Sequence, residues 1–289
     1  MSSIAILVVH DILRLDEKLI IEELRKRGIS HTLINLDKIL IDTESITTQF
    51  SNTNNIALIR SISHTRSELI SKIFEEIGIF VINPSHVIDI GNNKFLTLIK
   101  LAKNGIPVPK SILALSNEKA IEAFKIFSNG PLIVKPISGS WGRMVSLISR
   151  ASELELLIKH RSRMETPSMK ILMLQEYLEK PGRDIRIIVV EDRAVAGIYR
   201  YAPCMEWRTN TARGGKAEPV KIDPELEEIS VKASKSIGAL YSGVDIVETK
   251  DGYVVLEVNV VPEFKNVMRV TGINVANEIV NMLLRYLKK

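Results

Sequence analysis

The amino-acid sequence predicts an α/β protein with a parallel, helix-covered sheet in its N-terminal part. The first observation is that strand-like and helix-like segments alternate from residue 1 to about residue 88, which is typical of a parallel sheet with helices on its faces. The second is an alternation of apolar residues between Gly243 and Asn259, which predicts an antiparallel hairpin near the C-terminal end. A chain of 289 residues is long enough for two or three subdomains and a sizeable core.

The composition is that of an ordinary globular protein, and it restricts the classes of function. Hydrophobic residues make up 45% and charged residues 25%, as in folded rather than disordered chains. The single cysteine, Cys204, excludes a disulfide framework and a zinc site built from cysteines, and it suits a reducing, cytoplasmic location. The net charge of +5 favours an anionic partner. With 5% aromatic residues and no long basic run in the sequence, a stacking surface for nucleic acid is poorly supported.

The N-terminal region, residues 1–88, provides the alternation that predicts the parallel sheet. Its opening run, Ile4–Val9, is too short for a membrane span or a signal peptide and predicts a buried strand. No Gly-x-Gly-x-x-Gly motif follows this strand, so we expect no dinucleotide site there. The predicted strands lie near residues 4–9, 31–36, 56–61 and 80–83, and the predicted helices at about 16–25 and 65–76.

The central region contains a glycine-bearing loop, Ser138–Arg143, that follows a predicted strand at 132–135. Glycines let the backbone approach an anion closely, and Lys135 and Arg143 supply positive charge. Since the Gly-Lys-Ser/Thr of a Walker A motif is missing from the sequence here, an ordinary turn between two strands is an equal alternative. The lysine on the preceding strand favours a phosphate site. Helices are expected at about 94–103, 116–127 and 152–164.

The C-terminal region combines strands with a long polar loop. Residues Trp207–Ala217 are basic and show neither a helical nor a strand period, and a loop of this length in a compact domain is functional or disordered. Several arginines would attract anions if they converged, but they could equally be dispersed over the surface: Arg183, Arg186, Arg200, Arg208 and Arg213. Strands are expected at 172–178, 185–190 and 194–201, and helices at 223–240 and from about residue 275.

The hairpin of the C-terminal region is expected to close with the three-residue loop Lys250–Gly252, a common hairpin closure when the third residue is glycine. With that loop, Asp245 lies opposite Glu257, and Asn259 follows two residues later on the same face. The predicted apolar pairs of the other face are Val244 with Val258 and Ile246 with Leu256.

Two carboxylates and an amide held in register could bind Mg²⁺, which takes its remaining ligands from water and substrate phosphates. The alternative is a solvated strand face, on which acidic residues are ordinary. A two-residue Asp-Gly turn would place Asp245 and Glu257 on opposite faces and exclude the metal site.

These segments, in this order, resemble the ATP-grasp superfamily, and within it the RimK-like group of ligases that join an amino acid to a carboxylate of another chain. The resemblance covers nearly the whole chain. It implies an ATP-grasp fold with an N-terminal pre-ATP-grasp domain at 1–88, a central subdomain with the phosphate loop at 89–174, and a C-terminal subdomain with the metal and substrate sites at 175–289. The matching residues are Lys94, Lys135 with Gly139–Gly142, Gln175–Tyr177, Gly182–Arg186, Asn210–Ala212, Asp245, and Glu257 with Asn259.

The resemblance also implies a role for each matching segment. Arg186, Arg200 and Asn210 would be catalytic, facing the phosphate in transfer or the carboxylate that receives it. The residues implied to hold Mg²⁺ are Asp245, Glu257 and Asn259. Those implied to bind ATP are Lys94, Lys135, Ser138, Gly139, Ser140, Trp141, Gly142, Arg143, Gln175, Glu176, Tyr177, Leu178, Arg183 and Asp184. Those implied to line the amino-acid pocket are Arg200, Thr211, Ala212, Glu263, Phe264, Lys265, Asn266 and Val267.

Within this group, the chain is most similar to ligases that act on the small acidic carrier protein LysW. The implied reaction activates the side-chain carboxylate of LysW's C-terminal glutamate as an acyl phosphate, which the α-amine of α-aminoadipate attacks, in lysine biosynthesis. In the resembling ligases, Asn followed by a small residue suggests α-aminoadipate, whereas Gly-Phe suggests glutamate. This chain has Asn266-Val267, with valine where threonine or alanine is usual. Alternatives are glutamate (arginine biosynthesis), both amino acids, a RimK-like glutamate ligase for another protein, and a non-catalytic nucleotide-binding module.

The implied chemistry needs positioning and charge neutralisation rather than a protein nucleophile. We therefore expect His31, His64, His86 and His160 to be structural or surface residues. The pI of about 9.1 fits an acidic carrier, and we further expect a homo-oligomer.

Overall fold

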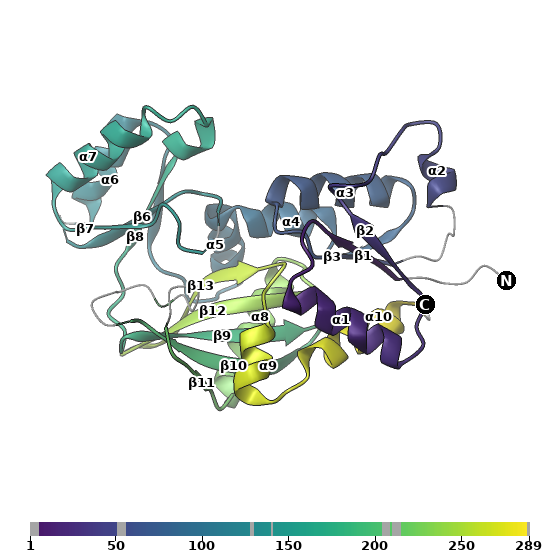
Figure 1. The fold of residues 1–289 in the computed structure, drawn as a ribbon. Helices are drawn as coiled ribbons and strands as arrows, with labels where there is room; N and C mark the ends of the chain where they lie inside the picture. The colour runs from purple at the N-terminus through teal and green to yellow at the C-terminus, as the bar shows by residue number, and fades with distance from the viewer. Residues whose placement is uncertain are drawn as a thin grey trace.

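The computed structural model describes residues 6–50, 56–127, 130–139, 141–203, 209 and 215–287. Within these residues the chain forms three β-sheets with helices packed against them (Figure 1), which confirms the α/β prediction. Every helix in the described ranges is too short or too polar to cross a membrane. The domain boundaries at 88 and 174 stay a prediction.

The N-terminal sheet is parallel, as predicted, with the strand order β2-β1-β3-β4. Its central strands are buried throughout, since helices cover them, and α1 turns Ile20, Ile21 and Leu24 towards the core. The strands are β1 (Ile6–His10), β2 (His31–Asn35), β3 (Ile56–Ile59) and β4 (Phe80–Ile82), and the helices are α1 (Leu15–Lys26), α2 (Ile46–Gln49), α3 (His64–Glu76) and α4 (Ser85–Asn92).

The middle sheet is antiparallel, with the order β5-β8-β6-β7. Leu132 and Val134 of β6 belong to the core cluster that α6 and α7 cover, so the period of two in a strand turns Ile133 and Lys135 to the opposite face. The elements are α5 (Lys94–Lys103), β5 (Ser111–Ala114), α6 (Asn117–Ile126), β6 (Leu132–Lys135), β7 (Ser146–Ile148), α7 (Ala151–Arg161), the 3₁₀ turn η1 (Pro167–Lys170) and β8 (Leu172–Glu176).

The third sheet is antiparallel and has the order β11-β10-β9-β12-β13. Its two faces contribute to separate core clusters: Ile187 packs in one and Ile188 in the other. The C-terminal helix α10 lies beside α1 (Figure 1), so the two ends of the chain pack together. The elements are β9 (Arg183–Val190), β10 (Arg193–Tyr201), β11 (Ala217–Pro219), α8 (Pro224–Ser236), β12 (Tyr241–Thr249), β13 (Gly252–Asn259), α9 (Lys265–Thr271) and α10 (Val275–Leu287).

The hairpin β12–β13 differs from the prediction at its turn. Thr249 pairs with Gly252, so the loop has two residues, Lys250 and Asp251, and the predicted three-residue loop is wrong. That loop alone would put Asp245 and Glu257 on opposite faces.

A β-bulge restores the predicted pair of carboxylates. The register shifts between Asp245, which pairs with Glu257, and Ile246, which pairs with Val255. Leu256 is therefore the extra residue of the bulged strand. The predicted pair of Ile246 with Leu256 is wrong: Val255 is buried in the core, and Leu256 lies in the wall of a cavity. The two departures from the predicted register cancel, and Asp245 opposite Glu257 is confirmed.

Candidate active site

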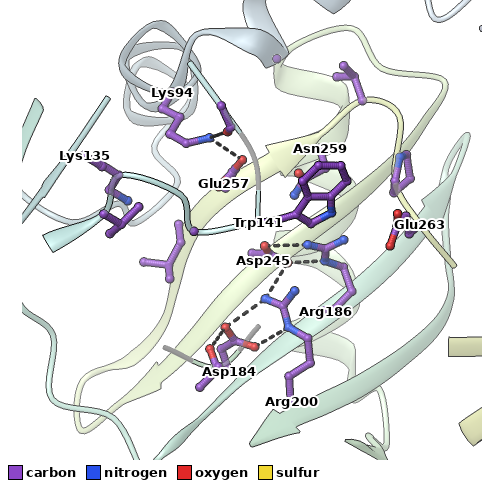
Figure 2. Close-up of a pocket in the computed structure, with 18 of the residues that line it drawn as sticks. Lys94, Lys135, Trp141, Asp184, Arg186, Arg200, Asp245, Glu257, Asn259 and Glu263 are labelled. Atoms are coloured by element: carbon purple, nitrogen blue, oxygen red, sulfur yellow. Dashed lines mark hydrogen bonds and ion pairs between the residues drawn. The ribbon is translucent and has the colours of Figure 1, made fainter. Parts of the chain in front are cut away.

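A cavity of about 400 Å³ lies where the middle sheet, the third sheet and loops of the N-terminal region meet. Figure 2 shows its charged wall, which includes Lys94, Lys135, Arg186 and Asp245. The cavity combines cationic and anionic side chains with the backbone of the glycine-bearing loop.

Asp245, on β12, lies at the centre of a network with Arg186 on β9 and Arg200 on β10, three adjacent strands of the third sheet. In the register of the sheet Asp245 is opposite Arg186, and Arg186 binds both oxygens of its carboxylate, with Nη2 at 2.8 Å from Oδ2. Arg200 Nη2 lies 3.1 Å from Asp245 Oδ1. Burial alone would raise the pKa of Asp245, but the two guanidinium groups outweigh it and lower the pKa. Asp245 is therefore an anion at neutral pH.

Arg200 forms a second, buried pair with Asp184. Its Nε and Nη2 lie 2.6 and 2.9 Å from the two carboxylate oxygens, a bidentate geometry that fixes the guanidinium plane. Thr209 donates its hydroxyl proton to the same carboxylate, and Lys180 donates to Thr209 Oγ1 at 3.3 Å. Asp184 thus orients Arg200 towards the cavity.

Lys94 connects the glycine-bearing loop to the hairpin. Its Nζ donates to the Gly139 carbonyl at 2.7 Å and to Glu257 Oε1 at 2.8 Å. Lys135 pairs through its backbone with β8, but its ammonium group makes neither a hydrogen bond nor an ion pair with any described residue. Burial lowers the pKa of Lys135 to about 8; Glu257 opposes this change and the positive charge of Lys94 adds to it. Lys135 is thus a cation facing the cavity at neutral pH, without an ion-pair partner in the described ranges.

The loop that follows β6 turns back on itself at the cavity. Gly139 and Gly142 have positive φ angles of 124° and 65°, which glycine adopts without steric cost. Trp141 also has a positive φ of 58°, and the Arg143 guanidinium lies 4.6 Å from the centre of its ring. Four residues of this loop line the cavity: Gly139, Trp141, Gly142 and Arg143. The loop therefore presents backbone and positive charge to the same space as Lys135.

The end of β8 forms a further wall. Gln175 is almost completely buried and donates from Nε2 to Ser111 Oγ at 2.9 Å, while Glu176 Oε1 accepts from the Lys110 amide at 2.6 Å. Tyr177 and Leu178 continue this wall. The segment therefore presents both polar groups and apolar surface to the cavity.

The hairpin face offers oxygen donors that suit a hard cation. Asp245, Glu257 and Asn259 contribute carboxylate and carboxamide oxygens, the donor types that Mg²⁺ prefers. Neither Glu257 Oε2 nor Asn259 Oδ1 receives a hydrogen bond from any described residue, whereas Asn259 Nδ2 donates to the Gly243 carbonyl at 3.3 Å. The described residues hold no cluster of three or more His, Cys, Asp or Glu side chains suited to a metal, and both oxygens of Asp245 already accept from Arg186. The fit to Mg²⁺ therefore rests first on Glu257 Oε2 and Asn259 Oδ1, with Asp245 as the third donor of the face.

The structure brings most of the predicted site residues to the cavity. Arg183 does not line it: its guanidinium binds Glu248 at 2.9 and 3.2 Å and stacks on Tyr199. Ser138 and Phe264 also lie outside its lining, and Phe264 is completely buried in the core. Predicted residues that lie outside the described part of the chain are Ser140, Asn210, Thr211 and Ala212, together with Arg208 and Arg213. The predicted residues that line the cavity are Lys94, Lys135, Gly139, Trp141, Gly142, Arg143, Gln175, Glu176, Tyr177, Leu178, Asp184, Arg186, Arg200, Asp245, Glu257, Asn259, Glu263, Lys265, Asn266 and Val267.

Sequence reasoning missed the contribution of the N-terminal region to this wall. Arg14, Ser61, Ile62 and His64 line the cavity, and all of them follow the carboxyl ends of β1 or β3. Parallel sheets bind ligands at that edge, a signal that could have identified these loops. Burial and the charge of Lys94 lower the pKa of His64, with Glu257 opposing. His64 is a cavity residue rather than a surface one.

Comparison with known proteins identifies the fold and the family. The RimK-like ATP-grasp domain matches residues 91–283, and the LysX preATP-grasp domain matches residues 4–90. The α-aminoadipate–LysW ligase LysX of Sulfurisphaera tokodaii is 39% identical over 98% of this chain and 99% of its own length. The glutamate–LysW ligase ArgX of the same organism is 38% identical over 96% of this chain and 97% of its own.

Solved structures share the fold at low sequence identity. The D-cycloserine synthetase DcsG has a TM-score of 0.76 at 19% identity, covering 98% of this chain and 99% of its own. The ATP-grasp ligase PsnB, in complex with a minimal precursor, Mg and ADP, has a TM-score of 0.73 at 22% identity, covering 99% and 98%. Together with the two matched domains, these likenesses show that the chain belongs to the RimK-like ATP-grasp family of ligases.

Proposed function

We propose that this ligase couples α-aminoadipate, through its α-amine, to the side-chain carboxylate of the C-terminal glutamate of LysW, with ATP as the source of energy. The observation that carries the proposal is the convergence of Lys94, Lys135, Arg186 and Arg200 with the oxygen donors of the hairpin on one cavity. Both LysW ligases named above, one for α-aminoadipate and one for glutamate, align with nearly the whole chain. A cytoplasmic location, a homo-oligomer and the absence of nucleic-acid binding stay predictions.

The residues of the cavity suit phosphoryl transfer to a carboxylate. A carboxylate oxygen attacks the γ-phosphorus of ATP and ADP leaves, a step that depends on positioning and charge neutralisation. Lys94 and Lys135 would neutralise the nucleotide phosphates, and Arg186 and Arg200 the transferred phosphoryl group. Asp245, Glu257 and Asn259 would hold Mg²⁺, which would supply further positive charge beside the nucleotide phosphates.

The second step forms the amide. The α-amine attacks the carbonyl carbon of the acyl phosphate, inorganic phosphate leaves with the electrons of the broken C–O bond, and the amine loses a proton to solvent. Arg186 and Arg200 are preorganised by Asp245 and Asp184, so they can stabilise the oxyanion of the tetrahedral intermediate without reorganising.

The choice of amino acid rests on the wall that Asn266 and Val267 form. A valine leaves more room than the phenylalanine expected for a glutamate enzyme, by about one methylene of ligand length. Since one methylene changes binding by only about 1–3 kcal/mol, we expect a preference for α-aminoadipate rather than strict exclusion of glutamate. Competition between the two amino acids, with carrier and ATP present, measures this preference; a higher kcat/KM for glutamate would assign the chain to the other substrate.

The test of the function is the mass of LysW after incubation with the enzyme, ATP, Mg²⁺ and each amino acid, together with release of ADP. We expect a mass gain of one α-aminoadipate residue on the C-terminal peptide. Asp245→Asn should lower the rate by about a hundredfold or more, whereas Asp251→Asn, in the exposed turn of the same hairpin, should not. A mass gain on a different protein would favour a RimK-like glutamate ligase, and ATP binding without ADP release would favour a non-catalytic module.

A further inference from the structure

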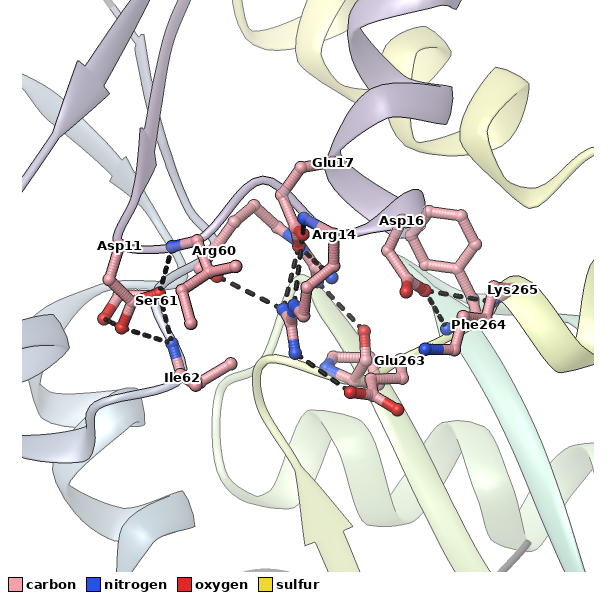
Figure 3. Close-up of polar contacts among 12 residues, drawn as sticks. Asp11, Arg14, Asp16, Glu17, Arg60, Ser61, Ile62, Glu263, Phe264 and Lys265 are labelled. Atoms are coloured by element: carbon pink, nitrogen blue, oxygen red, sulfur yellow. Dashed lines mark hydrogen bonds and ion pairs between the residues drawn. The ribbon is translucent and has the colours of Figure 1, made fainter. Parts of the chain in front are cut away.

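Asp16, at the start of α1, reaches across the molecule to the segment that follows β13. Its Oδ1 accepts hydrogen bonds from the amides of Phe264 at 2.6 Å and Lys265 at 2.9 Å, as Figure 3 shows. Asp16 is completely buried, and 248 residues separate it from Phe264. Burying a carboxyl group costs free energy because the group loses its water. The two hydrogen bonds from the distant segment offset part of this cost for Asp16.

The amides that Asp16 binds lie at the beginning of α9. The first amides of a helix have no partner within the helix, and a side chain of the preceding residue normally caps them. Here that residue is Phe264, which makes no side-chain cap. Asp16, which belongs to α1, caps these amides instead, and it thereby fixes where α9 begins.

A second connection joins the same two parts of the molecule. Arg14 Nη1 donates to Glu263 Oε1 at 3.0 Å, while its Nε and Nη2 bind the carboxylate of Glu17 at 3.1 and 2.8 Å. Glu17 is buried and accepts from Arg60 at 3.0 Å, and Arg60 also donates to the Pro262 carbonyl at 3.0 Å. Both ends of the short segment Pro262–Lys265 are thus held by the N-terminal region.

This segment leads into the wall at which the amino acid is proposed to bind. Glu263, Lys265, Asn266 and Val267 line the cavity, whereas Asp16 is not among the cavity-lining residues and acts through the backbone alone. A shift at the start of α9 would move Asn266 and Val267 together.

We propose that Asp16, assisted by Arg14, is a positioning residue that sets the affinity for the amino-acid substrate without touching it. The inference rests on the proposed function in one respect: the segment Glu263–Val267 must form the amino-acid pocket. It gives the N-terminal region a part in substrate selection in addition to its part in the fold.

The variants Asp16→Ala and Asp16→Asn test this role. Asp16→Ala leaves two buried amides without an acceptor, and we expect the KM for the amino acid to rise about tenfold, with the KM for ATP changed by less than about twofold. Asp16→Asn keeps the Oδ1 acceptor and should restore a KM near that of the natural enzyme. Glu22→Ala, on the exposed face of the same helix, is the matched control and should behave like the natural enzyme. Equal increases in both KM values, or no increase, would overturn the proposal.

Hydrogen exchange provides a readout that does not depend on the proposed reaction. The amides of Phe264 and Lys265 should exchange faster in Asp16→Ala than in Asp16→Asn, and unchanged exchange would contradict the capping role. Should Asp16→Ala fail to fold, Asp16→Glu keeps the charge but displaces the acceptor oxygen, and it should raise the KM for the amino acid while leaving that for ATP unchanged; a KM for the amino acid that does not rise would again overturn the proposal. A natural enzyme that is inactive with LysW, α-aminoadipate and glutamate would refute the proposed function, but not the capping role.

Discussion

At the scale of single residues, Lys135 shows how the cavity determines the charge of a side chain. Burial lowers its pKa to about 8, so Lys135 is protonated below that pH and loses its charge as the pH rises through it. We expect kcat/KM for ATP to decline above pH 8, because kcat/KM reports the free enzyme and a neutral amine attracts phosphate less.

The variant Lys135→Arg isolates this effect, since a guanidinium keeps its charge throughout the range. Its kcat/KM for ATP should be flat from pH 7 to about pH 9.5, whatever its absolute value. Profiles of the natural enzyme and the variant, measured with saturating amino acid and carrier, should differ only in the alkaline decline. The same decline in both would assign it to another group.

At the scale of elements, the sequence predicts the kinds of structure better than their register. The alternation of strands and helices up to residue 88 predicts the parallel sheet correctly. The spacing of apolar residues and the glycines at helix ends are local signals that the sequence shows directly. The predicted hairpin loop is one residue too long, and the sequence pattern does not predict the bulge at Leu256. A period of two cannot locate a bulge, because the extra residue is selected by packing: Val255 belongs in the core and Leu256 in the cavity wall.

The backbone directly after the glycine-bearing loop is held by α7. Arg161, at the end of α7, is buried and donates from Nη2 to the Met144 carbonyl, while its Nε and Nη1 have no hydrogen-bond partner among the residues that the structure describes. Burial lowers its pKa. A buried, poorly paired charge contributes little to stability, and an apolar replacement of similar size is often neutral or stabilising by about 1–4 kcal/mol.

We therefore expect Arg161→Met to keep or increase the free energy of unfolding, measured with urea, while raising the KM for ATP about tenfold, because the Met144 carbonyl loses its hydrogen bond. Arg150→Met, at the exposed start of the same helix, is the control and should leave the KM for ATP unchanged. A loss of more than about 3 kcal/mol in Arg161→Met would show that the arginine stabilises the fold itself.

At the scale of the whole molecule, the cavity is assembled from segments far apart in the sequence. The basic residues near the glycine loop could be predicted from local spacing, whereas the predicted pairing of Asp245 with Glu257 is right only because the shorter turn and the bulge offset each other. The loops of the N-terminal wall could have been identified from the edge of the parallel sheet, but their contact with the C-terminal region could not: Arg14 and Glu263 are 249 residues apart, and tertiary packing such as that of α1 beside α10 brings their segments together. The convergence of Arg186 and Arg200 on Asp245 likewise depends on the order of the strands in the sheet, which the sequence pattern does not predict.

The net charge of the chain, +5, leads to a prediction about the encounter with an acidic carrier. Charges separated by more than about 8–10 Å are screened at physiological salt, so long-range attraction raises the association rate mainly at low ionic strength. We expect kcat/KM for LysW to fall about tenfold between roughly 0.05 and 0.5 M NaCl, while kcat at saturating carrier changes little. The KM for the amino acid, measured at saturating carrier over the same salt range, is the control, because it reports any effect of salt on the cavity itself. A kcat/KM for LysW that is independent of salt would mean that short-range contacts near the cavity, rather than the overall charge, select the carrier.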